Sequence, residues 1–423
     1  PRCDFYASGA TAGDALRLLR GAALVSPSMS TRGEMSPRRR STSPPPPASL
    51  PDDMLGEILL RLPPRPSSLP RASLVSKRWY SLVADPQFQR RFRDHHGKPP
   101  LLGFFLQESP SSAFVPILDR PDRIPRGRFS MPLSEGTHIV DCRHGLVLSL
   151  SRSPPHRLLV WDPVAREQRR LVFPPELDND QMLRFNGAVL RPARSQGSHF
   201  QVALIAHYKV GNPCTRVFAC LYSSETGIWS KINSLQLQSS ISLLGPGPST
   251  LIGNSLCWLL WEPSDNYVIL EFDLDTQSLT ETELPPQVEA PLLKLRIVPT
   301  EDGGLGFIHL SGLHGQLWKR EPGSVWVLDR AIEFEELRSV CKGDRYPRVV
   351  GFSEDSNAIL LQTNSGVFMV YLRSMEFKKI SNMGVIRLRC PFACFYPAGT
   401  GIGDVHGGDD VLEYVKWLFV ETC

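Results

Sequence analysis

Residues 50–88 read LPDDMLGEILLRLPPRPSSLPRASLVSKRWYSLVADPQF, and this stretch decides how the rest of the chain is organised. Its first part predicts a helix that begins at Pro51, where a missing N–H group costs nothing. Asp52-Asp53 follow, and carboxylates suit the free N–H groups of a helix start. Apolar residues then recur at helical spacing as far as Leu62, and Pro63-Pro64 ends the helix.

A second amphipathic helix is expected from about Arg71 as far as Asp85-Pro86. Its apolar face comprises Ala72, Val75, Trp79 and Leu82. Pro66 and Pro70 lie between the two helices, so a proline-rich elbow is expected there rather than a third helix. Two helices of this length cannot bury their own apolar faces, and a partner surface must cover them.

The order of these residues resembles an F-box, a motif that covers about a tenth of the chain. The matching residues are Leu50-Pro51, Asp52-Asp53, Ile58-Leu59, Leu62-Pro63, Val75-Ser76-Lys77-Arg78-Trp79 and Asp85-Pro86-Gln87-Phe88. The resemblance implies binding to a Skp-family adaptor and, through it, to a cullin. The residues expected at the adaptor contact are Leu50, Pro51, Leu55, Ile58, Leu59, Leu62, Pro63, Val75 and Trp79. Trp79 suits the core of the helical domain equally well.

The segments before and after the F-box differ from it in composition and in the spacing of their apolar residues. Residues 1–48 are rich in Ser, Pro and Arg and are expected to be disordered, with Met29 and Met35 as candidate initiation residues. The F-box domain is expected to span residues 49–98, ending in a basic segment from Arg90 to Lys98, and a β-domain to span residues 99–423.

The composition is that of an ordinary globular protein, with 41% hydrophobic and 21% charged residues. A net charge of +4 over 423 residues gives no reason to expect nucleic acid as a partner, and no apolar run is long enough to span a membrane. The nine cysteines are scattered and form no CxxC pair, so reduced thiols in the cytoplasm or nucleus are expected.

From Leu101 onward, short apolar runs alternate with turn residues, a pattern that predicts strands. A strand that ends near an aromatic residue, a polar turn and a returning strand recur as one unit. The aromatic residues are Trp161, Tyr222, Phe272, Trp318 and Tyr371, at intervals of 46–61 residues. A period near fifty with several strands per unit is the spacing of kelch-like propeller blades.

We therefore predict a small all-α F-box domain followed by a large all-β domain, a degenerate β-propeller of about six blades. Residues 142–148 and 158–163 also resemble the F-box-associated β-propeller of plant F-box proteins. Leu101 to Leu106 and Phe392 to Tyr396 are expected to share one blade and close the ring, and residues 411–418 to form a short helix packed on it. A pair of β-sandwiches is the alternative fold.

Catalytic chemistry has little support in the sequence. The chain has no nucleophile elbow, no dinucleotide-binding loop and no paired histidines on a helix face. Asp162 and Asp273 are explained as turn residues, and His144 and His309 as packed or rim residues. No catalytic residue, cofactor or metal is expected.

The resemblance implies a non-catalytic substrate receptor of a Skp–cullin–F-box ubiquitin ligase, with the β-domain holding an unidentified protein target. Two polar loops, Arg123 to Arg128 and Asn212 to Thr215, are the candidates for target binding. A degron, a glycan and a small-molecule-gated target remain open. The alternative functions are an F-box scaffold acting outside a ligase and a propeller-fold carbohydrate-active enzyme.

Overall fold

The computed structural model describes the chain between residues 50 and 396, apart from short segments. The segments left out within this range are residues 109–110, 130, 133–135, 152–154, 179–182, 193–198, 209–215, 238–242, 245–246, 262–266, 287, 289–293, 324, 335–337, 339–346 and 383–387. The chain divides into two units, residues 1–50 and residues 51–423, and the second contains nearly all of the described structure.

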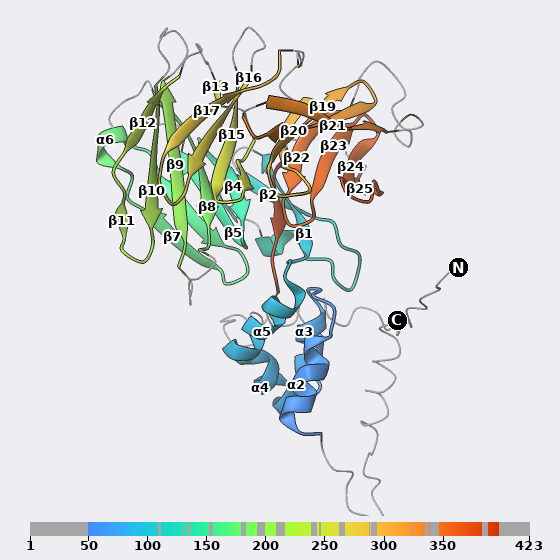
Figure 1. Cartoon of the computed structure of the whole chain (residues 1–423). Helices are drawn as coiled ribbons and strands as arrows, with labels where there is room; N and C mark the ends of the chain where they lie inside the picture. Colours follow the sequence, from blue (N-terminus) through green and yellow to red (C-terminus); the bar gives the residue numbers. More distant parts are fainter. Residues whose placement is uncertain are drawn as a thin grey trace, which may run out of the picture. The chain divides into compact units, whose positions relative to one another are not determined.

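Four helices form the helical domain that follows Leu50 (Figure 1). They are α2 (Asp52–Leu60), α3 (Ser68–Ser73), α4 (Lys77–Ala84) and α5 (Pro86–His96). The first predicted helix is therefore present as α2. The sequence prediction for the elbow was wrong, because α3 lies there, and the single helix predicted from Arg71 is divided between α3 and α4.

Two local features explain the helix that the elbow forms. Pro70 is the third residue of α3, a position whose N–H would have no intrahelical partner, so the proline is tolerated. Ser76 then ends the connection to α4, because its extended backbone stops the preceding turn and its Oγ accepts a hydrogen bond from Trp79 N–H at 3.2 Å.

The basic segment from Arg90 to Lys98 is mostly helical. Asp85 caps α5 through a 3.0 Å hydrogen bond from Phe88 N–H, and Pro86 occupies the first helical position. Phe88 and Phe92 point to the core while the arginines stay exposed, and Gly97, at a positive φ of 67°, ends the helix.

Six antiparallel sheets make up the β-domain, so the predicted six-bladed propeller is confirmed (Figure 1). Blade 1 contains β26 (Leu388–Ala393), β1 (Leu101–Glu108), β2 (Ser111–Pro116) and β3 (Met131–Pro132). Blade 2 contains β4 (Thr137–Arg143), β5 (Leu146–Ser151), β6 (Leu158–Asp162) and β7 (Glu167–Leu171). Blade 3 contains β8 (Leu183–Leu190), β9 (Gln201–Tyr208), β10 (Arg216–Ser223), β11 (Ile228–Trp229) and β12 (Asn233–Gln236).

The second half of the ring repeats this arrangement. Blade 4 contains β13 (Leu243–Leu244), β14 (Thr250–Ile252), β15 (Ser255–Trp261), β16 (Tyr267–Asp273) and β17 (Leu279–Glu283). Blade 5 contains β18 (Leu295–Pro299), β19 (Leu305–Ser311), β20 (His314–Glu321) and β21 (Val325–Glu333). Blade 6 contains β22 (Arg348–Ser353), β23 (Ala358–Thr363), β24 (Gly366–Tyr371) and β25 (Phe377–Ser381). A short 3-10 helix η1 (Arg126–Phe129) follows blade 1's second strand, and α6 (Pro175–Asp178) precedes blade 3.

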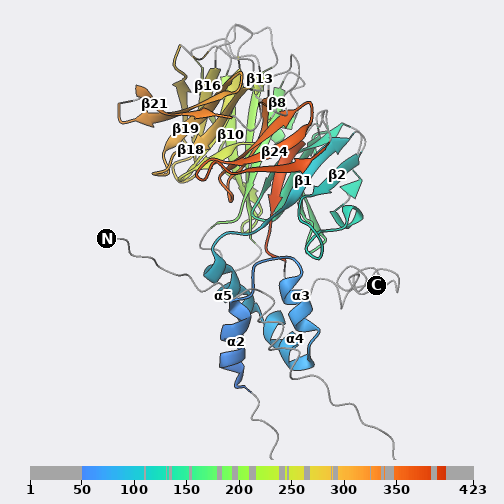
Figure 2. The ribbon, with the colours of Figure 1, turned by 90° about the vertical axis from the view of Figure 1, so that its right-hand side faces the viewer.

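The ring closes in blade 1, as predicted, because β26 from the end of the described chain pairs with β1 from its start. Figure 2 shows β1 and β2 next to β24 of blade 6. Phe104 of β1 is fully buried against Ala358, Leu360 and Met369 of blade 6, so an apolar core continues across the closing blade.

Three regions with predictions lie outside the described residues: the N-terminal segment 1–48, the loop Asn212 to Thr215 and the helix expected at residues 411–418. Among the residues that are described, none of the helices is both long enough and apolar enough to cross a membrane.

Candidate functional site

The helical domain has a core of its own, and burial separates its apolar residues into two sets. Leu55 and Leu59 of α2 are 4% and 1% exposed and pack with Val83, Phe88 and Phe92 of α4 and α5. Both leucines were expected at an adaptor contact. In this structure their side chains lie in the core of the helical domain, on the side of α2 that faces α4 and α5. Their contact with an adaptor remains a prediction.

The second set leaves an apolar surface uncovered. Met54 and Ile58 lie four residues apart on α2, hence on one face, and are 56% and 45% exposed. Val75, in the connection before α4, is 54% exposed. An ion pair of 2.6 Å between Asp52 and Arg78 brings the start of α2 to the start of α4, the helix that follows Val75. We call Met54, Ile58 and Val75, together with Pro51, the exposed helical face.

The other residues expected at the adaptor contact are distributed around this face. Leu50 is 46% exposed, Pro63 is exposed, and Leu62 and Trp79 are half-buried against the helical core. Leu74 and Tyr80 are also exposed apolar residues. Met54, Leu74 and Tyr80 were not among the expected contact residues. For Met54 the signal was present in the sequence, because a 3.6-residue period puts it on the Ile58 face rather than on the face of Leu55 and Leu59.

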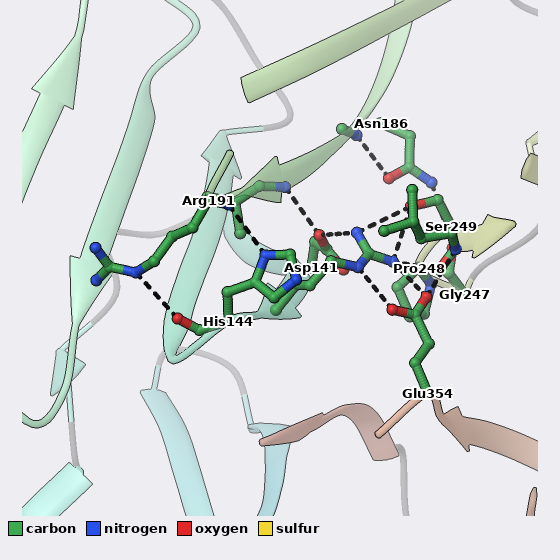
Figure 3. A network of polar contacts seen from close by, with 12 residues as sticks. Asp141, His144, Asn186, Arg191, Gly247, Pro248, Ser249 and Glu354 are labelled. Carbon is green, nitrogen blue, oxygen red and sulfur yellow. Dashed lines mark hydrogen bonds and ion pairs between the residues drawn. The ribbon is translucent and has the colours of Figure 1, made fainter. Parts of the chain in front are cut away.

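A second candidate site lies where the innermost strands of the propeller meet. Arg143, the last residue of β4, is 7% exposed, and its guanidinium donates two hydrogen bonds to Glu354, of 2.9 Å from Nε and 2.7 Å from Nη2. Its Nη1 donates to Asp141 Oδ2 at 2.8 Å, and its Nη2 to the Ser249 carbonyl at 3.1 Å. Figure 3 shows Asp141, Ser249 and Glu354 drawn together by these bonds. We call these four residues the central ion network.

The network joins most of the ring. Asp141 also accepts the N–H of Val189 in blade 3 at 2.8 Å, and Glu354, after β22 of blade 6, accepts the N–H of Leu251 in blade 4 at 2.8 Å. Beside the network, Arg296 of blade 5 donates to the carbonyl of Pro248, the residue before Ser249 in blade 4, at 3.0 Å. Every charged group of the network is used in contacts between blades, which suits a structural role rather than a reactive one.

The two carboxylates of the network have opposite pKa shifts. Burial raises the pKa of Asp141 to about 6, although the adjacent Arg143 charge counteracts the shift. Burial also acts to raise the pKa of Glu354, but the charge of Arg143 and its hydrogen bonds outweigh burial, so the pKa of Glu354 is lowered. Arg143 thus lies between two carboxylates, and the charges of both Asp141 and Glu354 favour its guanidinium.

The residues weighed for catalysis in the sequence have structural partners. Asp162 and Asp273 each accept two backbone N–H groups of their own turns through Oδ1. His144 accepts the N–H of Arg191 through Nδ1 at 3.0 Å, and burial together with the Arg143 charge lowers the pKa of His144 to about 4. Within the described parts of the chain, no three His, Cys, Asp or Glu side chains are grouped so as to hold a metal ion.

Of the two loops considered for target binding, only Arg123 to Arg128 lies in a described part of the chain. It follows Asp122, whose Oδ1 accepts hydrogen bonds from Ser67 N–H at 3.1 Å and Ser67 Oγ at 2.6 Å. This loop therefore begins at a contact with the helical domain.

Comparisons with known proteins agree with both domains. The family model described as "F-box protein AT5G49610-like, beta-propeller" matches residues 138–394, more than half of the chain, and the F-box domain model matches residues 48–91. F-box protein At5g03970 of Arabidopsis thaliana is 26% identical over 307 residues, which cover 68% of this chain and 70% of that protein. F-box protein At5g07610 of the same plant is 24% identical and covers 68% and 71%.

Solved structures resemble the chain only weakly. A fucose-specific lectin from Aleuria aurantia aligns with 68% of this chain and 99% of its own length, at 9% identity and a TM-score of 0.36. The family models are decisive, because they match the helical domain and the propeller separately and in the observed order. The chain therefore belongs to the plant F-box proteins that carry an AT5G49610-like β-propeller.

Proposed function

We propose that this protein is the substrate receptor of a Skp–cullin–F-box ubiquitin ligase, acting in the cytoplasm or nucleus. The helical domain binds a Skp-family adaptor, the adaptor connects it to a cullin, and the propeller holds a protein target. The receptor performs no bond chemistry, and its contribution is to raise the effective concentration of the target at the ubiquitin-transfer site.

The observation that carries the proposal is the exposed helical face. Met54, Ile58 and Val75 are apolar, about half exposed and displayed over a well-packed core of leucines and phenylalanines. A small helical domain that leaves such residues in water is suited to a helix-in-groove contact, in which the apolar face supplies most of the affinity. Arg78 and Arg91, paired with Asp52 and Glu57, provide a polar rim beside this face.

Co-expression of residues 45–423 with a Skp-family adaptor, followed by size-exclusion chromatography, tests the proposal. We expect a one-to-one complex that also retains a cullin. Ile58→Asp should weaken adaptor binding at least hundredfold, because it puts a charge into the centre of the apolar contact. Val172→Asp is the matched control, since Val172 is 81% exposed on the propeller, and its complex should elute unchanged.

Leu50→Ala combined with Pro51→Ala should also abolish co-elution while leaving the propeller folded. Full retention of the adaptor by this double variant and by Ile58→Asp would exclude the helical face as the contact. A complex with the adaptor that never retains a cullin would instead favour a scaffold acting outside a ligase.

A further inference from the structure

Asp122 is a buried carboxylate whose side-chain partners come from the helical domain. Its side chain is 8% exposed, and it lies in the connection between β2 and η1 of the propeller. Its Oδ1 accepts both the N–H and the hydroxyl of Ser67, at 3.1 and 2.6 Å, and Ser67 is itself 5% exposed. Arg65 adds an ion pair of 3.4 Å to Oδ2, but its side chain is 67% exposed and contributes little.

The segment that carries Asp122 is firmly held by the propeller. Ile124 and Phe129, which follow it, are 1% and 0% exposed in the core cluster that contains Phe114 and Phe392 of blade 1. Asp122 N–H also donates to the Asp119 carbonyl at 2.9 Å. The carboxylate is therefore fixed from the propeller side, and Ser67 is fixed as the residue before α3.

A second contact between the two domains lies at the other end of the propeller chain. Phe395, just after β26, packs against the helical core, with its ring centroid 6.3 Å from that of Phe92 at an interplanar angle of 79°. Cys394 N–H, beside it, donates to the Pro100 carbonyl at 3.2 Å. The covalent link between the domains is short, since α5 ends at His96 and β1 begins at Leu101.

We propose that Asp122 and Phe395 together lock the propeller onto the helical domain at two separate points. One contact plus the short link would leave a hinge, whereas two separate contacts, one with Ser67 before α3 and one with Phe92 of α5, remove that rotation. Building on the proposed function, the lock holds a target bound to the propeller at a fixed orientation to the adaptor, which is the geometric requirement of catalysis by proximity. Asp122 and Phe395 are positioning residues in this arrangement.

Hydrogen exchange measured by mass spectrometry on the full chain tests the lock without any partner. Asp122→Ala should raise amide exchange in residues 65–70 at least tenfold and leave residues 146–151 of the propeller unchanged. Asp122→Asn keeps an acceptor for Ser67 and should give an intermediate rate. Asp119→Ala is the matched control, because Asp119 lies in the same connection with an exposed side chain and should change nothing.

Small-angle X-ray scattering of the full chain measures the rotation itself. The variant carrying both Asp122→Ala and Phe395→Ala should show a broader distribution of interatomic distances than wild type, and either single variant a smaller change. Exchange within twofold of wild type in Asp122→Ala, or unchanged scattering of the folded double variant, would overturn the lock. Adaptor affinity should stay within twofold in these variants, and a wild-type chain that ignores the adaptor would reject the proposed function while leaving the exchange result valid.

Discussion

At the scale of single residues, the central ion network contains two carboxylates that contribute differently to stability. The pKa of Asp141 is raised by burial to about 6, from an ordinary value near 3.8, so the folded protein binds this proton more tightly than the unfolded chain does. The free energy of unfolding that Asp141 contributes therefore falls as the pH rises from about 4 through 6. Glu354 has the opposite effect, because the Arg143 charge lowers its pKa despite burial. The stability that Glu354 contributes is present above its ordinary pKa near 4.5, and it is lost as the pH falls through the lowered pKa of the folded protein.

Neutral isosteres of the two residues should separate these effects. Asp141→Asn should stay within about 1 kcal/mol of wild-type stability at pH 8 and flatten the pH dependence between 4 and 7, because the buried charge was unfavourable there. Glu354→Gln should cost about 2–4 kcal/mol at pH 8, since it leaves the Arg143 guanidinium with a weakened partner. Urea unfolding at several pH values measures both, with Asp275→Asn in an exposed turn as the control. Equal losses in the two variants would contradict the assignment.

Sequence reasoning singled out only part of this network. The residues Cys142 to Gly145 stood out because they resemble the family, but their charge was not matched to a partner. Glu354 is 211 residues from Arg143 in sequence. Only the closed ring brings β4 and the end of β22 together, so no local pattern could have paired them. By contrast, helical periodicity alone predicts that Met54 and Leu55 lie on different faces of α2, so this assignment needed no structure.

At the scale of secondary-structure elements, the sequence predicted turns correctly where a side chain bonds its own backbone. It predicted helices less well where tertiary contacts stabilise them. The Asp162 and Asp273 turns form as predicted, because the side chain satisfies its own backbone. The elbow between α2 and α4 was predicted wrongly. Proline is unfavourable in a helix interior, but α3 is so short that Pro70 falls in its first turn. The burial of Leu69 and Ala72 against the rest of the helical domain stabilises the helix further.

Two tryptophans connect the outer strands of neighbouring blades in the same manner. Trp229 of β11 donates its indole N–H to the Val172 carbonyl at 2.8 Å, and Trp326 of β21 donates to the Glu283 carbonyl at 2.8 Å. In each case an exposed apolar residue, Ile228 or Val325, precedes the tryptophan. At these two places the returning strand of the repeated unit therefore also contacts the neighbouring blade.

Replacing these tryptophans by phenylalanine should reveal different contributions. Trp229→Phe should cost about 1 kcal/mol, because it removes one hydrogen bond near the surface. Trp326→Phe should cost about 2–3 kcal/mol, because its ring also packs edge-on against the fully buried Phe307 at 4.9 Å, whereas the ring of Trp229 lies tilted on the half-buried Tyr222 at 5.3 Å. Chemical denaturation gives both values. Equal losses in the two variants would show that the hydrogen bond they share, rather than ring packing, decides the cost.

At the scale of the whole molecule, the sequence predicted the ring and the way it closes. The period near fifty residues, with the first and last apolar strands left without copies of their own, implied a shared closing blade. The structure confirms it in the pairing of β26 with β1. The two-point lock on the helical domain could not have been foreseen, since Asp122 and Phe395 lie in connections whose position depends on the completed propeller.

Closure by a single strand makes the stability of the ring depend on β26. Phe392 of that strand is 1% exposed, and its ring centroid lies 5.4 Å from Phe105 and 5.6 Å from Phe129. Phe392→Ala should cost about 3–5 kcal/mol, the usual loss for a large buried aromatic side chain. Because neighbouring blades share apolar cores across the closing blade, the loss should lower the unfolding temperature of the whole propeller in one transition.

Calorimetry measures this, with Ile228→Ala, at a 67% exposed site, as a control expected to change stability by less than about 0.5 kcal/mol. A separate early transition, with the remainder of the propeller melting at the wild-type temperature, would mean that blade 1 opens independently and that the ring is not one cooperative unit.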